Sequence, residues 1–356
     1  MNIQILCTLG PRSLDPHVIA ALDAQEVDLF RINLSHTSID EVERLIAFIR
    51  RHSSTAICLD TEGPQVRSGL MENDVRLERG TRIVLTAEDV AGSSRRCTLR
   101  PPSIIGALDI GSIVEIDFDG AAVRVVATKG NDVIGEVVEG GRVRSNKAVS
   151  VHPQPTLPSL SDKDVAAVAI GVRHEITHYA LSFASTAKDV QLLRELAGDG
   201  AHIIAKIESR AGIRNMDEII QAADSILIDR GDLSREVPIE HVPYCQKAIV
   251  RRANLWRKPA YVATNLLESM VTNRTPTVAE ANDIANTLLD GVHGLVLAAE
   301  TAVGMDPVGA VAMIRRAVEA FERATLHEVL AVTDGAVDAA ARRSTAVSGS
   351  RLHRRR

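Results

Sequence analysis

Eight short runs of apolar and β-branched residues recur along the chain, separated by segments of helical periodicity. The runs cover residues 3–9, 29–34, 56–60, 179–183, 203–207, 225–229, 260–264 and 294–298. Nearly continuous apolar runs are typical of strands buried on both faces, and the segments between them predict amphipathic helices, for example over residues 39–50, 189–196 and 307–321. Eight strand-helix units predict an α/β fold of the (β/α)8 TIM-barrel class.

The pattern changes between residues 65 and 150. Short stretches of alternating polar and apolar residues cover 82–86, 112–118, 122–128 and 133–138, and turn sequences rich in glycine follow them. Alternation with such turns predicts antiparallel strands. We therefore expect a barrel domain of residues 1–64 and 151–325, a small β-barrel-like lid domain of residues 65–150 inserted after the third strand, and a basic, disordered tail of residues 326–356.

Composition limits the classes of function. Apolar residues make up 45% of the 356 residues, and the formal charge of −5 argues against a general nucleic-acid-binding protein. No run of about 18 uncharged apolar residues is present to span a bilayer, and the N-terminus lacks a signal-peptide pattern. The four cysteines have neither metal-site spacing nor the density of a disulfide framework. We expect a cytoplasmic protein with reduced thiols and no membrane or nucleic-acid partner.

Charged residues follow the predicted strands at the end where β/α barrels carry their active sites. Lys206 and Glu208 lie two apart on one strand, so both side chains face the same way. Asp232 follows the next strand and is expected to lie beside Glu208. Two carboxylates that leave coordination positions open suit Mg²⁺ or Mn²⁺. The alternative interpretation is a salt-bridge cluster at the barrel rim.

Eight segments resemble, in order and spacing, the signature sequences of the pyruvate kinase family. They are LCTLGPRS, FRINLSH, LDTEGPQVRSG, SLSDKD, KIES, DRGDL, ATNLLESM and EANDIANTLLDGVHGLVLAAETAVG. The resemblance covers residues 3–325. It implies a glycolytic enzyme that transfers a phosphoryl group between phosphoenolpyruvate and ADP, giving pyruvate and ATP through a divalent-metal-stabilised enolpyruvate. K⁺ is an expected second cofactor. The family's C-terminal domain is expected to be absent, and we expect a homodimer.

The resemblance also implies a role for each matching residue. Catalytic roles fall on Lys206, Thr264, Arg31 and Arg67. Substrate binding falls on Gly231, Asp232, Thr264, Lys206 and Ser185, with the backbone N–H groups of Gly231 and Asp232 expected to hold the substrate carboxylate. The divalent metal is expected on Glu208 and Asp232, and K⁺ on Asn33, Ser35, Asp60 and Thr61. The nucleotide is expected to contact Pro11, His36, Arg67 and Lys147.

Some positions depart from the family pattern. Thr186 replaces an aromatic residue beside the substrate, Asp229 replaces a small residue, and Val303 replaces a lysine on the nucleotide side. Gln65 stands at the position whose residue type correlates with K⁺ dependence in the family. Glutamine is not the usual residue there, so the sequence leaves K⁺ dependence undecided. These departures favour an alternative function in which the same site serves a lyase, a decarboxylase or a kinase for another enol or keto acid. A non-catalytic regulator is a further alternative.

Overall fold

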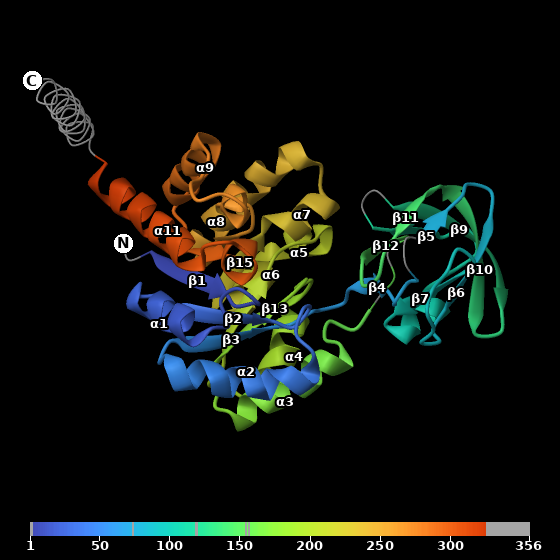
Figure 1. Ribbon diagram of the computed structural model, residues 1–356, viewed down its shortest axis with the longest axis horizontal. Helices are drawn as coiled ribbons and strands as arrows, with labels where there is room; N and C mark the ends of the chain where they lie inside the picture. The colour runs from blue at the N-terminus through green and yellow to red at the C-terminus, as the bar shows by residue number, and fades with distance from the viewer. Residues whose placement is uncertain (1–2, 73–74, 118–119, 154, 156, 325–356) are drawn as a thin grey trace, which may run out of the picture.

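The computed structural model describes residues 3–324 except 73–74, 118–119, 154 and 156. Its main body is a closed barrel of parallel strands surrounded by helices (Figure 1). The barrel strands are β1 (Gln4–Thr8), β2 (Leu29–Asn33), β3 (Ala56–Asp60), β13 (His178–Leu181), β14 (His202–Lys206), β15 (Ser225–Asp229), β16 (Ala260–Ala263) and β17 (Gly294–Leu297). Each predicted run overlaps one of these strands, so the predicted TIM-barrel class is confirmed.

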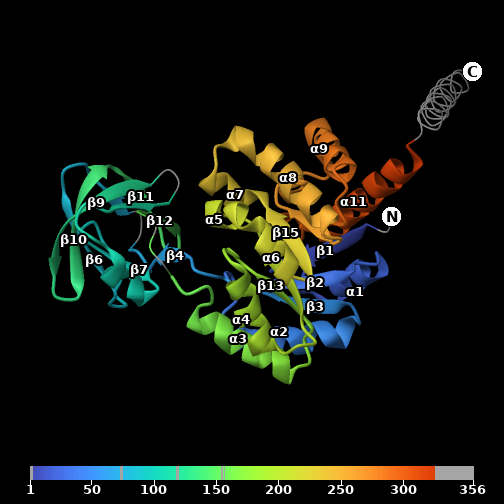
Figure 2. The same ribbon diagram turned by 180° about the vertical axis from the view of Figure 1, so that it is seen from behind.

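The helices cover the outside of the barrel (Figures 1 and 2). They are α1 (Pro16–Ala24), α2 (Ile39–His52), α3 (Asp162–Arg173), α4 (Ala187–Ala197), α5 (Arg210–Arg214), α6 (Met216–Ala222), α7 (Arg230–Glu236), α8 (Val242–Leu255), α9 (Val278–Leu289), α10 (Ala299–Ala302) and α11 (Pro307–Arg323). Among the described residues, no helix has the length and apolar character needed to cross a membrane. The predicted tail, residues 326–356, lies outside the described residues.

Two apolar layers explain why the strand sequences are nearly continuous in apolar residues. One strand face packs against the helices through fully buried side chains such as Ile5, Phe30 and Leu59. The opposite face fills the barrel interior, with side chains such as Leu6 and Leu227. Because both faces are buried, the strands lack the polar alternation of a half-exposed sheet.

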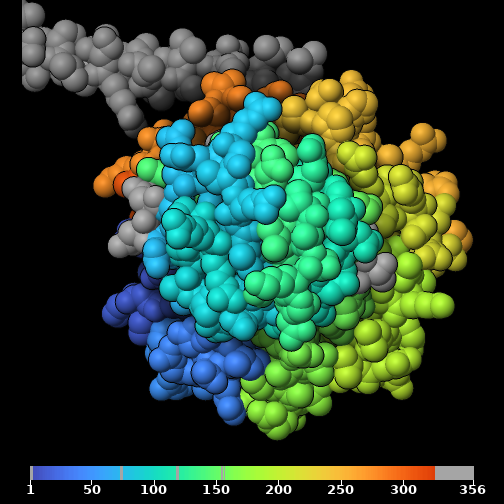
Figure 3. Space-filling view, turned by 90° about the vertical axis from the view of Figure 1, so that its right-hand side faces the viewer, coloured from blue at the N-terminus to red at the C-terminus, as the bar shows by residue number. Residues whose placement is uncertain are grey.

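A second closed barrel interrupts the first one after β3 (Figure 1). Its strands are β4 (Val66–Ser68), β6 (Arg82–Thr86), β7 (Arg96–Arg100), β8 (Ile113–Ile116), β9 (Ala121–Lys129), β10 (Asp132–Glu139) and β12 (Ala148–His152). The strands β5 (Val75–Leu77) and β11 (Gly141–Val143) form a separate pair, and the 3-10 helices are η1 (Pro102–Ala107), η2 (Ile239–His241) and η3 (Glu268–Val271). Figure 3 shows this insert in front of the main barrel. The domain boundaries themselves stay predictions.

Candidate active site

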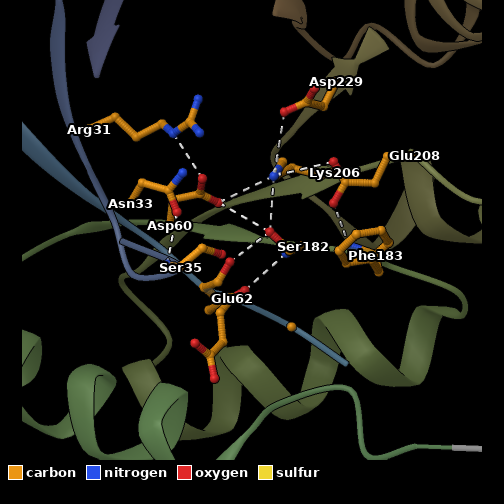
Figure 4. Close-up of polar contacts among 12 residues, drawn as sticks. Arg31, Asn33, Ser35, Asp60, Glu62, Ser182, Phe183, Lys206, Glu208 and Asp229 are labelled. Atoms are coloured by element: carbon orange, nitrogen blue, oxygen red, sulfur yellow. Dashed lines mark hydrogen bonds and ion pairs between the residues drawn. The ribbon is translucent and has the colours of Figure 1, made fainter. Parts of the chain in front are cut away.

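The candidate site is built where the barrel strands end. In the barrel, β15, β14, β13, β3 and β2 are consecutive neighbours. Register places Asn33 beside Asp60 and Lys206 beside Leu227. The polar residues that end these strands therefore meet at one edge, although they are far apart in the sequence (Figure 4).

Lys206 lies at the centre of this cluster. Its Nζ is 3.2 Å from Glu208 Oε2, 3.7 Å from Asp60 Oδ1 and 3.9 Å from Asp229 Oδ2. The side chain is only 5% exposed. Burial alone would lower the pKa of Lys206, but the three carboxylates outweigh it and raise that pKa. Lys206 therefore carries a buried positive charge that faces three acidic side chains.

Arg31 supplies a second buried cation. Its Nε lies 2.8 Å from Asp60 Oδ2, and the two side chains are 5% and 1% exposed. Asp60 thus lies between Arg31 on one side and Lys206 on the other (Figure 4). Two buried cations, each paired with carboxylates, therefore lie at this edge of the barrel.

Glu208 is fully buried, and its carboxylate is only partly satisfied. Its Oε1 accepts a hydrogen bond from the Phe183 N–H at 2.8 Å. Its Oε2 has no hydrogen-bond partner among the described residues. Burial, together with repulsion by Asp232 and other acidic neighbours, raises the pKa of Glu208 to about 8 despite the attraction of Lys206. An added cation would relieve the repulsion and bind the Oε2 atom, which the described residues engage through the ion pair with Lys206.

The residues present fit a divalent cation. Glu208, Asp229 and Asp232 each offer one ligand atom, and these atoms all lie within 4.8 Å of one another. Oxygen ligands in this number leave coordination positions for substrate or water, as Mg²⁺ and Mn²⁺ require. Asp232 also lies 3.3 Å from Arg235 and keeps 19% side-chain exposure, so the cluster reaches solvent on the α7 side.

Thr264 and Gly231 both donate hydrogen bonds to Asp229. The Thr264 Oγ1 donates to Asp229 Oδ1 at 2.6 Å, and the Gly231 N–H donates to the same oxygen at 3.1 Å. Thr264 has a φ of 73°, and its carbonyl oxygen accepts two hydrogen bonds from the Arg230 guanidinium. One of the two N–H groups expected to hold a substrate carboxylate, that of Gly231, and the hydroxyl of the predicted substrate contact Thr264 are therefore engaged by a carboxylate of the chain itself.

The four residues predicted to bind K⁺ lie together at the ends of β2 and β3. The Asn33 side-chain oxygen accepts the Ser35 N–H, and the Thr61 hydroxyl oxygen accepts the Ser182 N–H, both at 2.9 Å. Lys163 donates to the Leu34 carbonyl oxygen between Asn33 and Ser35. The Leu34 carbonyl oxygen, which lies between Asn33 and Ser35 in the sequence, is thus already bound by a cation of the chain.

The predicted nucleotide contacts are more spread out. Arg67 lies on β4 and donates to Gln65 and to the Asn146 carbonyl oxygen. Burial, followed by the charges of Arg67, Arg31 and Lys163, lowers the pKa of His36. Lys147 lies in the insert, where its backbone pairs with Ser68. Pro11 follows β1 in an exposed position.

Comparison with known proteins identifies the family. A model of the pyruvate kinase barrel domain matches residues 1–311. Curated relatives include the pyruvate kinases of Geobacillus stearothermophilus, 37% identical over 338 residues, and Thermotoga maritima, 33% identical over 332 residues, and pyruvate kinase PKLR of Homo sapiens, 34% identical over 352 residues. The chain belongs to the pyruvate kinase family. The alignments cover 91%, 90% and 92% of this chain, and 57%, 71% and 61% of those pyruvate kinases.

Membership of the pyruvate kinase family confirms the resemblance found in the sequence, while the role of each residue stays a prediction. Ser185, predicted to bind substrate, donates to the Phe183 carbonyl oxygen. Its N–H and that of Thr186 both donate to Asp189, so Ser185 and Thr186 form the turn that begins α4. Val303 ends α10 and is 51% exposed.

Sequence reasoning missed two residues that position the cluster. The Lys206 ammonium donates to Ser182 Oγ at 3.0 Å, and Ser182 in turn donates to the Thr61 carbonyl oxygen at 2.7 Å. The backbone of Phe183, with a φ of 54°, directs its N–H to Glu208. A signal was present for Ser182, because it follows the strand next to the Lys206 strand and is the first hydroxyl at that exit.

Proposed function

We propose that the chain transfers a phosphoryl group between phosphoenolpyruvate and ADP, giving pyruvate and ATP. The observation that carries this proposal is the buried Lys206 ammonium, which lies beside the metal-suited carboxylates of Glu208 and Asp232. Phosphoryl transfer has a loose transition state whose negative charge spreads over the equatorial oxygens, so fixed cations stabilise it. The names of the relatives agree with this activity.

The steps follow from what each side chain can do. The bond between the enol oxygen and phosphorus breaks while a β-phosphate oxygen of ADP bonds to that phosphorus, and the enolate carbon then takes a proton. Lys206 and Arg31 offset the charge of the phosphoryl group in flight. Glu208 and Asp232 would hold the divalent cation, which would supply further positive charge to stabilise the transition state. The family resemblance assigns Thr264 to orient the substrate near the carbon that is protonated.

A pyruvate-coupled assay tests this function. The wild-type chain is mixed with phosphoenolpyruvate, ADP and Mg²⁺, with and without K⁺, and pyruvate is followed through lactate dehydrogenase. We expect turnover that depends on Mg²⁺ and is lost in Lys206→Met. The control variant Lys247→Met, which removes a half-exposed lysine paired with Asp290, should retain it. Absence of pyruvate from the wild type in every condition would rule the proposal out.

One observation favours a second candidate. Asp229 already engages the Gly231 N–H, which is one of the two expected donors for the carboxylate of phosphoenolpyruvate, and the hydroxyl of Thr264, a predicted substrate contact. A lyase, a decarboxylase or a kinase acting on a different enol or keto acid would use the same cation and lysine. Mg²⁺-dependent binding of oxalate without pyruvate formation would favour this candidate. A non-catalytic regulator would neither bind oxalate nor form pyruvate.

We also propose K⁺ as a cofactor, a homodimer as the assembly and the cytoplasm as the location. The oxygen groups of Asn33, Ser35, Asp60 and Thr61 support the K⁺ site.

The homodimer is supported by exposed apolar surface. Large apolar side chains are exposed on neighbouring η2 and α8, where Ile239 and Tyr244 are 71% and 72% exposed. Exposed apolar surface of this kind favours self-association. Light scattering after size-exclusion chromatography should give twice the 38.4 kDa chain mass.

A further inference from the structure

Asp229 has more hydrogen-bond and ion-pair partners than are required to cap a helix. Its carboxylate begins α7 by accepting the Gly231 N–H, which is an ordinary capping contact. The same oxygen also accepts the Thr264 hydroxyl at 2.6 Å, and the other oxygen lies 3.9 Å from the Lys206 ammonium. The residue is 8% exposed. Three groups that attract an anion therefore converge on Asp229, from β14, from the residue that follows β16 and from α7.

An anionic ligand must compete with Asp229 for these groups. A hydroxyl or an N–H donates one proton, so Thr264 and Gly231 can bind a second carboxylate only when their bonds to Asp229 are weakened or broken. The negative charge of Asp229 also opposes the binding of an anion. It adds to the charges of Glu208 and Asp232, whose ligand atoms lie within 4.8 Å of it. Each further negative charge raises the electrostatic cost of bringing in a dianion.

We propose that Asp229 is a specificity-determining residue that occupies the Thr264 and Gly231 donors and thereby weakens the binding of small carboxylate ligands at this site. The inference rests on the proposed function for the location of the substrate. With Asp229 in place, a carboxylate substrate binds only by displacing it. An enol or keto ligand without a carboxylate at this position has no such competitor.

Oxalate binding tests the inference without any need for turnover. Oxalate is a small dianion with two carboxylates. Its affinity is measured by calorimetry at saturating Mn²⁺, after the Mn²⁺ affinity of each variant has been determined by electron paramagnetic resonance. The variants are Asp229→Ala, which frees both donors, and Asp229→Asn, which keeps an acceptor oxygen but removes the charge. The matched control is Asp306→Ala, which removes a capping carboxylate that accepts the Gly309 N–H at the start of α11.

We expect Asp229→Ala to bind oxalate at least about tenfold more tightly than the wild type, since it frees two donors and removes one charge. Asp229→Asn should fall between the two, and Asp306→Ala should match the wild type. Oxalate affinity that is unchanged or weaker in Asp229→Ala would overturn the inference, as would a failure of every variant to bind oxalate. Loss of Mn²⁺ binding in both Asp229 variants would also overturn it, because Asp229 would then serve the cation. Failure of the proposed function appears separately, as absence of pyruvate from the wild type.

Discussion

Replacing Lys206 by Met should destabilise the metal-free protein by about 3–5 kcal/mol, the usual effect of removing one partner from a buried ion pair. The ammonium lies 3.2 Å from Glu208 and within 4 Å of Asp60 and Asp229. At an effective dielectric constant near 20, two unit charges about 3.2 Å apart attract each other by roughly 5 kcal/mol. Methionine has a similar length but no charge, so the change leaves three buried carboxylates with less compensation. This figure applies above pH 8, because the pKa of Glu208 is raised to about 8; at lower pH Glu208 is largely protonated and the loss is smaller.

The assay is urea unfolding followed by circular dichroism, with and without Mg²⁺. We expect Mg²⁺ to stabilise Lys206→Met more than the wild type, because the cation replaces the missing positive charge beside Glu208. The control Lys247→Met breaks one ion pair at 52% lysine exposure and should change the free energy of unfolding by less than about 1 kcal/mol. If Lys206→Met without metal is as stable as the wild type, the electrostatic account of the cluster is wrong.

Three further outcomes are expected. Glu208→Gln should weaken Mn²⁺ binding at least about tenfold by electron paramagnetic resonance, and unchanged affinity would exclude Glu208 as a ligand. Ser182→Ala, which removes the acceptor of the buried ammonium, should lower kcat about tenfold with little change in KM, whereas a change confined to KM would contradict this role. Hydrogen bonds from Ser53 and Thr55 lower the pKa of Asp23, so its stabilising contribution is present above about pH 4 and is lost as the pH falls through the lowered pKa. Asp23→Asn should therefore reduce the melting temperature at neutral pH, and the difference should shrink as the pH falls below about 4; a difference independent of pH would refute the assignment.

The barrel was predictable because its strands are buried on both faces and read as nearly continuous apolar runs. The insert was only partly predictable. Strands β6, β8, β9 and β10 alternate over enough residues to be recognised, whereas β4, β5 and β11 have three residues each, too few for alternation to be seen. The strand β7 has the sequence RCTLR. An arginine flanks its buried centre on each side, so the segment lacks the apolar pattern of a buried strand.

In the site, too, features set by nearby residues in the sequence were predictable, whereas contacts set by the packing of distant segments were not. Lys206 and Glu208 were predicted to share one face of a strand, but β14 ends at Lys206 and Glu208 lies just beyond it. The predicted pairing holds all the same, because the two charged groups lie 3.2 Å apart. Asp229 was recognised as an unusual carboxylate, but its contacts were not predictable. Its hydrogen bonds from Thr264 and Gly231 depend on how the end of β16 lies against the start of α7, with Thr264 in a positive-φ conformation. Sequence spacing carries no information on that arrangement.

The most direct test of the account is the location of a bound divalent cation. Crystals grown with Mn²⁺ are measured near the manganese absorption edge, and the anomalous difference map shows where the ion lies. We predict one strong peak at about 2.0–2.3 Å from carboxylate oxygens of Glu208 and Asp232, on the side facing Lys206. A fully occupied Mn²⁺ elsewhere, or no peak beside Glu208 at saturating Mn²⁺, would contradict the central claim.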